Sequence, residues 1–175
     1  MSPLITTKIK PVLDQDFVPA VLWNEAYLEE VNQSAKATEF AIALVRPDQT
    51  CTVFRTKILP CGGSTDELTL RYLERILKFL LWQRGGSEVL VAGCDPLVSQ
   101  LKKIYSPHGA RAFDHDFFGE KVYRSTLKIR ACAMKDLPTE NESSMPLGRH
   151  LDGCRIGFDL GGSDRKCAAV NRHRR

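Results

Sequence analysis

The chain has 175 residues, of which 43% are hydrophobic and 26% are charged, and this composition is typical of one soluble globular domain or of one domain plus a fragment. The formal net charge is +4, but Arg172, Arg174 and Arg175 contribute three of these charges within the last four residues, so the rest is nearly neutral. This distribution argues against a nucleic-acid-binding surface, which needs a basic patch on a folded face.

The sequence gives no sign of a membrane or zinc protein. It has no run of about 18 consecutive apolar residues, so we expect neither a membrane span nor a membrane partner. Its N-terminus lacks the pattern of a signal peptide. The six cysteines are scattered singly, and Cys94 and Cys132 are expected to be small buried hydrophobic residues. A cytoplasmic location with reduced thiols is therefore the expectation.

The first predicted element is a short helix within residues 19–35. Its apolar face would consist of Val21, Leu22, Ala26 and Leu28. Neither here nor later does the sequence show a helix-turn-helix signature, so DNA binding is not expected.

Three stretches predict strands. Residues 39–47 and 51–59 are separated by turn residues and predict a β-hairpin. The nearly all-apolar centre of the first stretch indicates a strand that is covered on both faces. Residues 88–93 predict a further short, buried strand.

The clearest helix lies between the second and third of these strands. Ser64 is a suitable N-cap, and Glu67, three residues later, would complete a capping box. Gly85 and Gly86 would end the helix. One apolar stripe at helical spacing contains Leu70, Leu73, Ile76, Leu77, Leu80 and Leu81.

Another helix is predicted to begin with Asp95 as N-cap and Pro96 at its first position. Its inward-facing residues would be Leu97, Leu101, Ile104 and Tyr105. Residues 110–134 predict one or two more strands around a turn at Gly119. Strands that alternate with helices indicate an α/β fold in which helices pack on a mixed sheet.

A polar segment over residues 137–153 interrupts this pattern, because it contains two prolines and has no periodicity. We therefore expect an α/β N-terminal domain over residues 1–136, a linker over 137–153, and a separate element over 154–175.

Two further places in the sequence could form a binding site, but a simpler explanation is favoured for each. Asp114, His115 and Asp116 carry metal-ligating side chains, yet no partner ligands are identifiable, so a polar loop is favoured. Gly93 lies between a strand and a helix and would suit a ligand-binding crossover. A strand-to-helix turn capped by Asp95 explains it more simply.

The last element, Arg155–Val170 ("RIGFDLGGSDRKCAAV"), predicts a strand, a glycine turn and a second strand. One face of the first strand would hold Ile156, Phe158 and Leu160. Asp159 would project from the other face, beside the turn. At Gly161 and Gly162 a phosphate could approach bare backbone N–H groups.

A carboxylate and a phosphate repel each other, so both can lie at one site if a Mg²⁺ ion lies between them. Asp159 would hold this metal, Ser163 would add a hydroxyl donor, and Arg165 or Lys166 would add positive charge. A plain hairpin with a glycine turn is the alternative. Asp159 favours a functional role, since an acid is unfavourable inside a strand of apolar and glycine residues.

The stretch "IGFDLGGSDRKCAAV" resembles the first phosphate motif of the sugar kinase, actin and hexokinase superfamily, and more narrowly that of the ROK family of sugar kinases and repressors. The residues that match outright are Ile156, Gly157, Asp159, Gly161 and Gly162. Ser163 replaces the usual threonine and keeps the hydroxyl group. Asp164 stands where the family commonly has lysine, and Lys166 is a candidate substitute on the same strand face. The matched stretch covers less than a tenth of the chain.

The resemblance implies ATP-dependent phosphoryl transfer to a sugar hydroxyl, with ATP and Mg²⁺ as cofactors. It implies that Asp159 lies near the metal and that Gly161, Gly162, Ser163 and Lys166 surround the phosphates. The family's catalytic base and second phosphate motif should follow well downstream of this hairpin. We therefore expect a truncated ROK-like, actin-like ATPase domain, with "NRHRR" as a frameshift or truncation product, and no catalysis by this chain alone.

The alternative hypothesis is a non-catalytic protein. In it, residues 1–136 form a self-sufficient binding or regulatory module, and the hairpin is an accessory element. An exposed strand edge in the hairpin would also allow a homodimer.

Overall fold

The computed structural model describes residues 4–142 and 153–171. Contacts divide the chain into two compact units, Met1–Glu142 and Ser143–Arg175. Residues 143–152, which form part of the predicted linker, lie outside the described residues.

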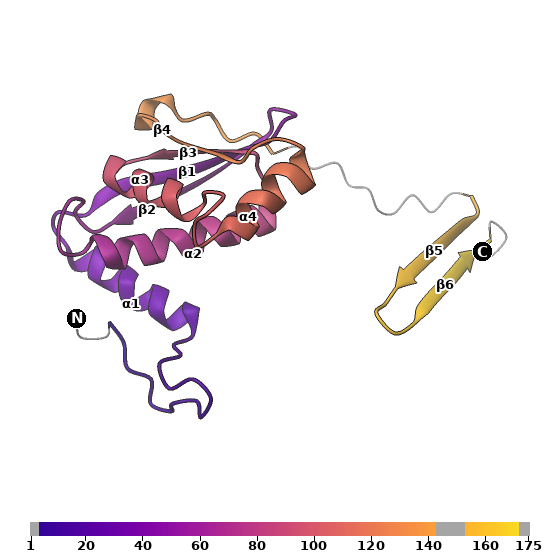
Figure 1. Cartoon of the computed structure of the whole chain (residues 1–175), viewed down its shortest axis with the longest axis horizontal. Coiled ribbons are helices and arrows are strands. Elements are labelled where there is room, and N and C mark those ends of the chain that lie inside the picture. The colour runs from indigo at the N-terminus through magenta and orange to yellow at the C-terminus, as the bar shows by residue number, and fades with distance from the viewer. Residues whose placement is uncertain (1–3, 143–152, 172–175) are drawn as a thin grey trace. The chain divides into compact units, whose positions relative to one another are not determined.

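The first unit is built on a four-stranded sheet with the order β2-β1-β3-β4 (Figure 1). Its strands are β1 (Thr38–Val45), β2 (Cys51–Ile58), β3 (Glu88–Ala92) and β4 (Lys128–Ala131). Strands β2 and β3 flank β1 and run antiparallel to it, whereas β4 runs parallel to β3. The predicted α/β class with a mixed sheet is confirmed.

The central strand β1 is buried on both faces, as its apolar sequence predicts. Phe40, Ile42 and Leu44 belong to the main hydrophobic core together with residues of the helices. Ala41 and Ala43, which point to the opposite face because side chains alternate along a strand, are also fully buried. Figure 1 shows α1 and α2 on one side of this sheet.

The segment that follows β4 covers the opposite face, and we call residues 132–142 the strap. It starts at the β4 edge and reaches the other edge, where Asn141 pairs with Cys51 of β2. On the way, the Met134 sulfur lies 3.8 Å from the Arg55 guanidinium. At the end of the strap, Arg84 Nη1 lies 3.2 Å from Glu142 Oε2. The small side chains of β1 on this face leave room for such a close crossing.

Helix α1 (Ala20–Gln33) forms where a helix is predicted, but it buries a different face. Its buried residues are Trp23, Tyr27 and Val31, which are spaced four residues apart. Of the predicted apolar face, Leu28 packs against the core, but Val21 and Leu22 are exposed, so that part of the prediction is wrong. The rings of Trp23 and Tyr27 stack with centroids 5.8 Å apart, and this aromatic pair directs the helix onto the core.

Helix α2 (Asp66–Arg84) carries the predicted apolar stripe into the core and ends at Gly85, whose φ is 70°. Its start differs from the prediction: Thr65 is the N-cap, and no side-chain capping bond forms. Instead, the backbone N–H of Gly62 donates to the carboxylate of Asp66, so the acid of the first turn fastens the preceding loop.

Helix α3 (Asp95–Ile104) has Cys94 rather than Asp95 as its N-cap. Leu97, Leu101 and Tyr105 are buried as predicted. At the preceding Gly93, where φ is +120°, a Cβ atom would collide with the backbone of β1. This glycine therefore has a packing role in an ordinary strand-to-helix turn.

The region 110–134 differs most from the prediction. It begins with a short helix, α4 (Ala112–Asp116), continues as a π-helical segment, η1 (Phe117–Tyr123), and ends with the single strand β4. The contacts of the Asp114 side chain explain why α4 is a helix. Asp114 is buried and accepts hydrogen bonds from Trp82 Nε1 at 2.7 Å and from Lys78 Nζ at 3.3 Å, a contact that fixes α4 against α2.

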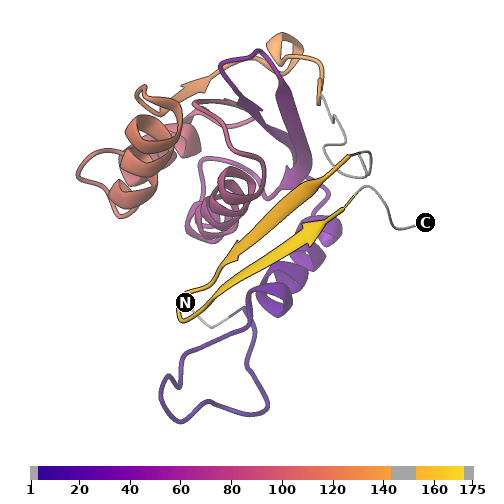
Figure 2. The same ribbon diagram turned by 90° about the vertical axis from the view of Figure 1, so that its right-hand side faces the viewer.

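The described part of the second unit is an antiparallel hairpin of β5 (Arg155–Leu160) and β6 (Arg165–Val170), drawn in yellow tones in Figure 2. The predicted strand, turn and strand are confirmed. Every residue of both strands is exposed. A two-stranded hairpin is only marginally stable in water, so this element has no core of its own. Across both described ranges, no helix has the length and apolar character that a membrane crossing requires.

Candidate phosphate-binding hairpin

The hairpin brings two of the predicted site residues together across its strands. Asp159 of β5 lies directly opposite Lys166 of β6, so both side chains project from the same face. Asp159 Oδ2 lies 3.9 Å from Lys166 Nζ, and both side chains are about 70% exposed (72% and 69%). This acid–lysine pair stands at the end of the hairpin, next to the glycine turn.

Asp164 also approaches the same ammonium group, with its Oδ2 atom 3.3 Å from Lys166 Nζ. Lys166 therefore balances two carboxylates rather than one. A phosphate that entered here would meet a net negative charge. Binding thus requires a cation between acid and phosphate, or a turn of Lys166 away from the acids and toward the phosphate.

The two turn glycines have different surroundings. A Cβ atom on Gly161 would come within 3.1 Å of the Asp164 backbone oxygen and still closer to the Asp164 carboxylate. Asp164 therefore folds against Gly161, and a side chain at position 161 would displace its carboxylate. A Cβ on Gly162 would meet nothing within 4 Å, so the turn is open there to an approaching group.

The residues present fit a magnesium ion only in part. In the described ranges, no group of three or more histidine, cysteine, aspartate or glutamate side chains is arranged to hold a metal ion. Mg²⁺ often binds through one or two carboxylates, with its other ligands from water and phosphate. Asp159 suits that limited role, whereas a site made of protein ligands alone is not available here.

The other face of the hairpin is an exposed apolar surface. Ile156 is 65% exposed, Phe158 71% and Leu160 75%. We call these three residues the apolar face of the hairpin. The side that carries Asp159 and the apolar side are therefore separated as strand alternation predicts.

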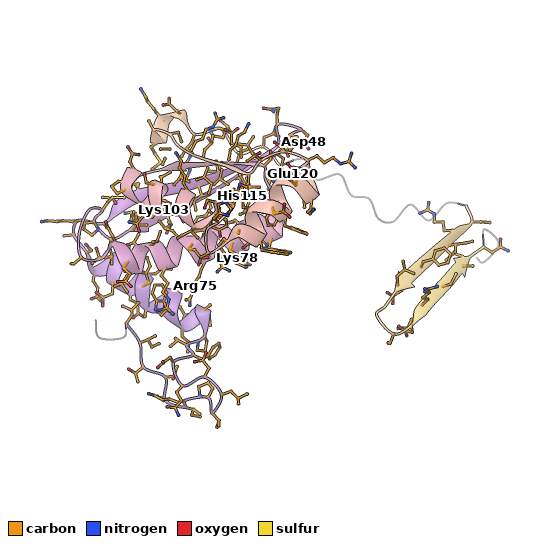
Figure 3. All side chains as sticks on the ribbon, viewed as in Figure 1. Asp48, Arg75, Lys78, Lys103, His115 and Glu120 are labelled. Carbon is orange, nitrogen blue, oxygen red and sulfur yellow. A yellow bond between two sulfur atoms is a disulfide. The ribbon has the colours of Figure 1, made fainter. Side chains whose placement is uncertain are left out.

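The cluster of Asp114, His115 and Asp116 lies on α4 and not in a polar loop or a strand. Asp114 points into the protein, and Asp116 Oδ2 lies 3.9 Å from Lys121 Nζ. His115 and Glu120, labelled in Figure 3, line a small cavity of about 230 Å³. Because the helix separates the two aspartates, they do not form a shared metal site.

One feature of the first unit has no counterpart in the sequence-based predictions. Trp82 of α2 stacks on Phe117 with centroids 5.0 Å apart, and Phe113 stacks on Phe117 at 5.8 Å. Phe79, Trp82 and Phe113 are exposed. We call Phe79, Trp82, Phe113 and Phe117 the aromatic face. The spacing of Phe79 and Trp82, three residues apart on the side of α2 away from its leucines, was the available signal.

Comparisons with protein-family models, with curated proteins and with solved structures find no match to this chain.

Proposed function

We propose that the hairpin Arg155–Val170 is the first phosphate-binding element of a ROK-like, actin-like ATPase domain, and that the protein is the N-terminal part of a sugar kinase-related protein of the cytoplasm. The observation that supports this most is the position of Asp159, opposite Lys166 and beside an open glycine turn. A metal–phosphate group at the turn would be contacted by Asp159, Gly161, Gly162, Ser163 and Lys166. The sequence resemblance supplies ATP and a sugar as the expected ligands.

Phosphoryl transfer works by positioning and by charge stabilisation from several groups. The hairpin offers Asp159, Asp164, one ammonium group and one turn, and both carboxylates pair with Lys166. We therefore expect weak nucleotide binding and no turnover from these 175 residues by themselves.

The test is calorimetric titration of the full chain with MgATP, compared between two matched variants. Asp159→Asn removes the acid of the cross-strand pair on the hairpin. Glu39→Gln removes the acid of the equivalent pair in the first sheet, where Glu39 faces Lys57 and their charged atoms are 3.7 Å apart.

We expect weak binding that Asp159→Asn reduces several-fold and Glu39→Gln leaves unchanged. Binding that both variants retain in full, or no binding at all, would contradict the proposal. Sugar phosphorylation by this chain would contradict the expectation that the hairpin alone is not catalytic.

A second candidate function is a non-catalytic binding module, and the aromatic face favours it. An exposed patch of stacked rings on a soluble domain marks an interaction surface. The elements that carry the aromatic face also carry charges of both signs, on Lys78, Asp116 and Lys121. Figure 3 shows Lys78 on α2. In a symmetric dimer, a surface with charges of both signs can be complementary to the same surface of its copy, whereas charges of one sign would repel each other. The occupant that fits is a second copy of this chain.

Sedimentation velocity of the full chain tests this candidate. We expect a concentration-dependent dimer that the double substitution Phe79→Ser and Phe113→Ser abolishes and that Phe158→Ser, on the hairpin, leaves intact. A dimer lost only with Phe158→Ser would assign self-association to the hairpin instead. A monomer at all concentrations would reject the dimer.

A further inference from the structure

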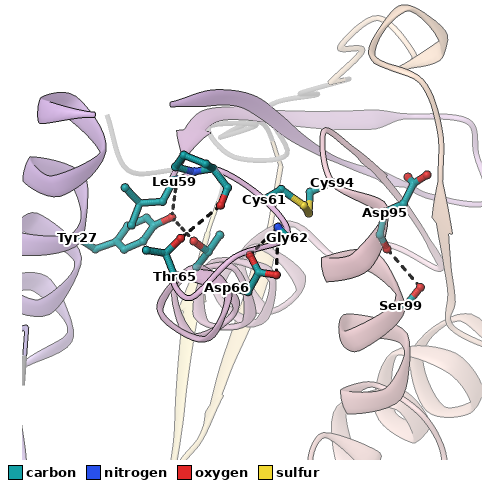
Figure 4. Close-up of a disulfide and its surroundings, with 11 residues drawn as sticks. Tyr27, Leu59, Cys61, Gly62, Thr65, Asp66, Cys94, Asp95 and Ser99 are labelled. Carbon is teal, nitrogen blue, oxygen red and sulfur yellow. Dashed lines mark hydrogen bonds between the residues drawn. A yellow bond between two sulfur atoms is a disulfide. The ribbon is translucent and has the colours of Figure 1, made fainter. Parts of the chain in front are cut away.

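Cys61 and Cys94 form a disulfide, contrary to the expectation of free thiols (Figure 4). Their Cα atoms are 6.1 Å apart, and 33 positions separate them in the sequence. Cys61 follows β2 and Cys94 follows β3. Because both strands are antiparallel to β1, the disulfide joins two loops at the same end of the sheet.

The two cysteine residues are unequally exposed, although Cys61 also packs against the edge of the core. Cys94 is buried, with 5% of its surface exposed, and the preceding Gly93 packs tightly against the backbone of β1. Cys61 is partly exposed and is followed by Gly62 and Gly63, where an added Cβ would meet nothing within 4 Å. A reagent from solvent therefore reaches the sulfur of Cys61 first.

The two sulfur atoms also differ as leaving groups. Cys94 is the N-cap of α3, a helix of ten residues. The helix dipole stabilises a negative charge at a helix N-terminus. Its effect here is reduced because the Cys94 side chain accepts no capping bond, Pro96 in the first turn has no N–H, and the carboxylate of Asp95 is adjacent. A thiolate that is stabilised in its place leaves more readily in disulfide exchange. The greater exposure of Cys61 and the stabilisation of a Cys94 thiolate thus both favour attack on Cys61 with Cys94 as the leaving group.

We propose that the Cys61–Cys94 disulfide is a thiol–disulfide exchange site for low-molecular-weight thiols of the glutathione class. The thiolate of the small thiol forms a bond to Cys61 Sγ, the S–S bond breaks, and its electron pair leaves on Cys94, which takes up a proton. A second thiol then attacks the sulfur of the small thiol in this mixed disulfide and releases Cys61, which also takes up a proton. Two thiols are oxidised to one disulfide, and the two cysteines are reduced.

Exchange would free the loop from α3 without unfolding it. Leu59 N donates to the Tyr27 hydroxyl at 3.3 Å, and the Thr65 hydroxyl donates to the Pro60 carbonyl at 3.3 Å (Figure 4). These bonds, together with that from Gly62 to Asp66, do not involve the sulfur atoms. The site is therefore a reversible link between two loops in an otherwise folded unit.

The test uses the full chain with Cys154→Ser and Cys167→Ser, because these two exposed free thiols would compete for the reagent. The oxidised protein is treated briefly with reduced glutathione and quenched with acid, and the adduct is located by peptide mass spectrometry. We expect about tenfold or more adduct on Cys61 relative to Cys94, since attack follows access and leaving-group stability. In the same background, Cys94→Ser should hold glutathione persistently on Cys61 when oxidised glutathione is added.

Three results would overturn the proposal. The first is an adduct mainly on Cys94, and the second is a disulfide that is reduced only in denaturant. The third is the absence of any Cys61–Cys94 disulfide in protein that was purified without reductant. Circular dichroism of each variant shows whether the fold is retained, and Cys61→Ser should protect Cys94 from alkylation until the protein unfolds.

Discussion

The tripeptide Gly-Gly-Ser occurs three times in this chain. Residues 85–87 lie between α2 and β3, and the other two copies, at residues 62–64 (the first turn) and 161–163 (the second turn), have different surroundings. The first connects β2 to α2 in the packed unit, and the second connects β5 to β6 in the exposed hairpin. An acid follows each of them closely, Asp66 in the first case and Asp164 in the second.

In the first turn, a side chain of the protein already accepts a hydrogen bond from the backbone N–H of the turn. The Gly62 N–H donates to the Asp66 carboxylate at 3.0 and 3.2 Å, and Cys61 is tied to α3. In the second turn, Asp164 pairs with Lys166, and Gly162 stays open. The same tripeptide is therefore closed by an acid in the first turn and stays open at Gly162 in the second.

The largest expected contrast is in stability. Leu77→Ala, in the fully buried core of the first unit, should lower the free energy of unfolding by about 2–5 kcal/mol. Phe158→Ala, on the exposed apolar face of the hairpin, should change it by less than about 0.5 kcal/mol. Urea denaturation followed by circular dichroism measures both. Equal losses would mean that the hairpin packs against a core.

The disulfide beside the first turn provides the next contrast. Replacing Cys61 and Cys94 together by serine should lower the free energy of unfolding by about 3–4 kcal/mol, because the bond constrains an unfolded loop of this length. The matched control replaces the free Cys154 and Cys167 by serine and should have little effect. Urea denaturation without reductant reports both. A destabilisation that persists unchanged under reducing conditions would show that side-chain packing, not the bond, is responsible.

The smallest expected effect lies within the first turn. Gly62 has a φ of +86°, which a side chain rarely adopts, so Gly62→Ala should cost about 1–2 kcal/mol. Gly63→Ala is the control, since its Cβ would meet nothing within 4 Å and its φ lies outside the left-handed region. Thermal unfolding of the two variants side by side measures the difference. Similar losses in both would indicate that the positive φ of Gly62 is not what limits this turn.

The sequence predicts the elements whose pattern is strong and local. The leucine spacing of α2 and the apolar run of β1 predict both elements, and the hairpin follows from its alternation and glycines. Residues 112–123 are missed because their aromatic and β-branched side chains favour strands, whereas the buried bonds of Asp114 to α2 hold them in helical form.

The candidate site is predictable only in part, for a similar reason. Alternation places Asp159 on the glycine face, but the packing of Asp164 against Gly161 depends on turn geometry that the sequence does not specify. The disulfide joins residues that are 33 positions apart, and nothing in their local sequence links them. Contacts between distant segments are set by the whole fold.

We propose that the second turn binds a metal–phosphate group and that the first does not. Amide resonances in a ¹⁵N-labelled sample of the full chain test it directly during titration with MgADP. We expect saturable shifts at Gly161, Gly162 and Ser163, and no shifts at residues 62–64. Equal shifts in both turns, or an unchanged hairpin at millimolar nucleotide, would contradict it.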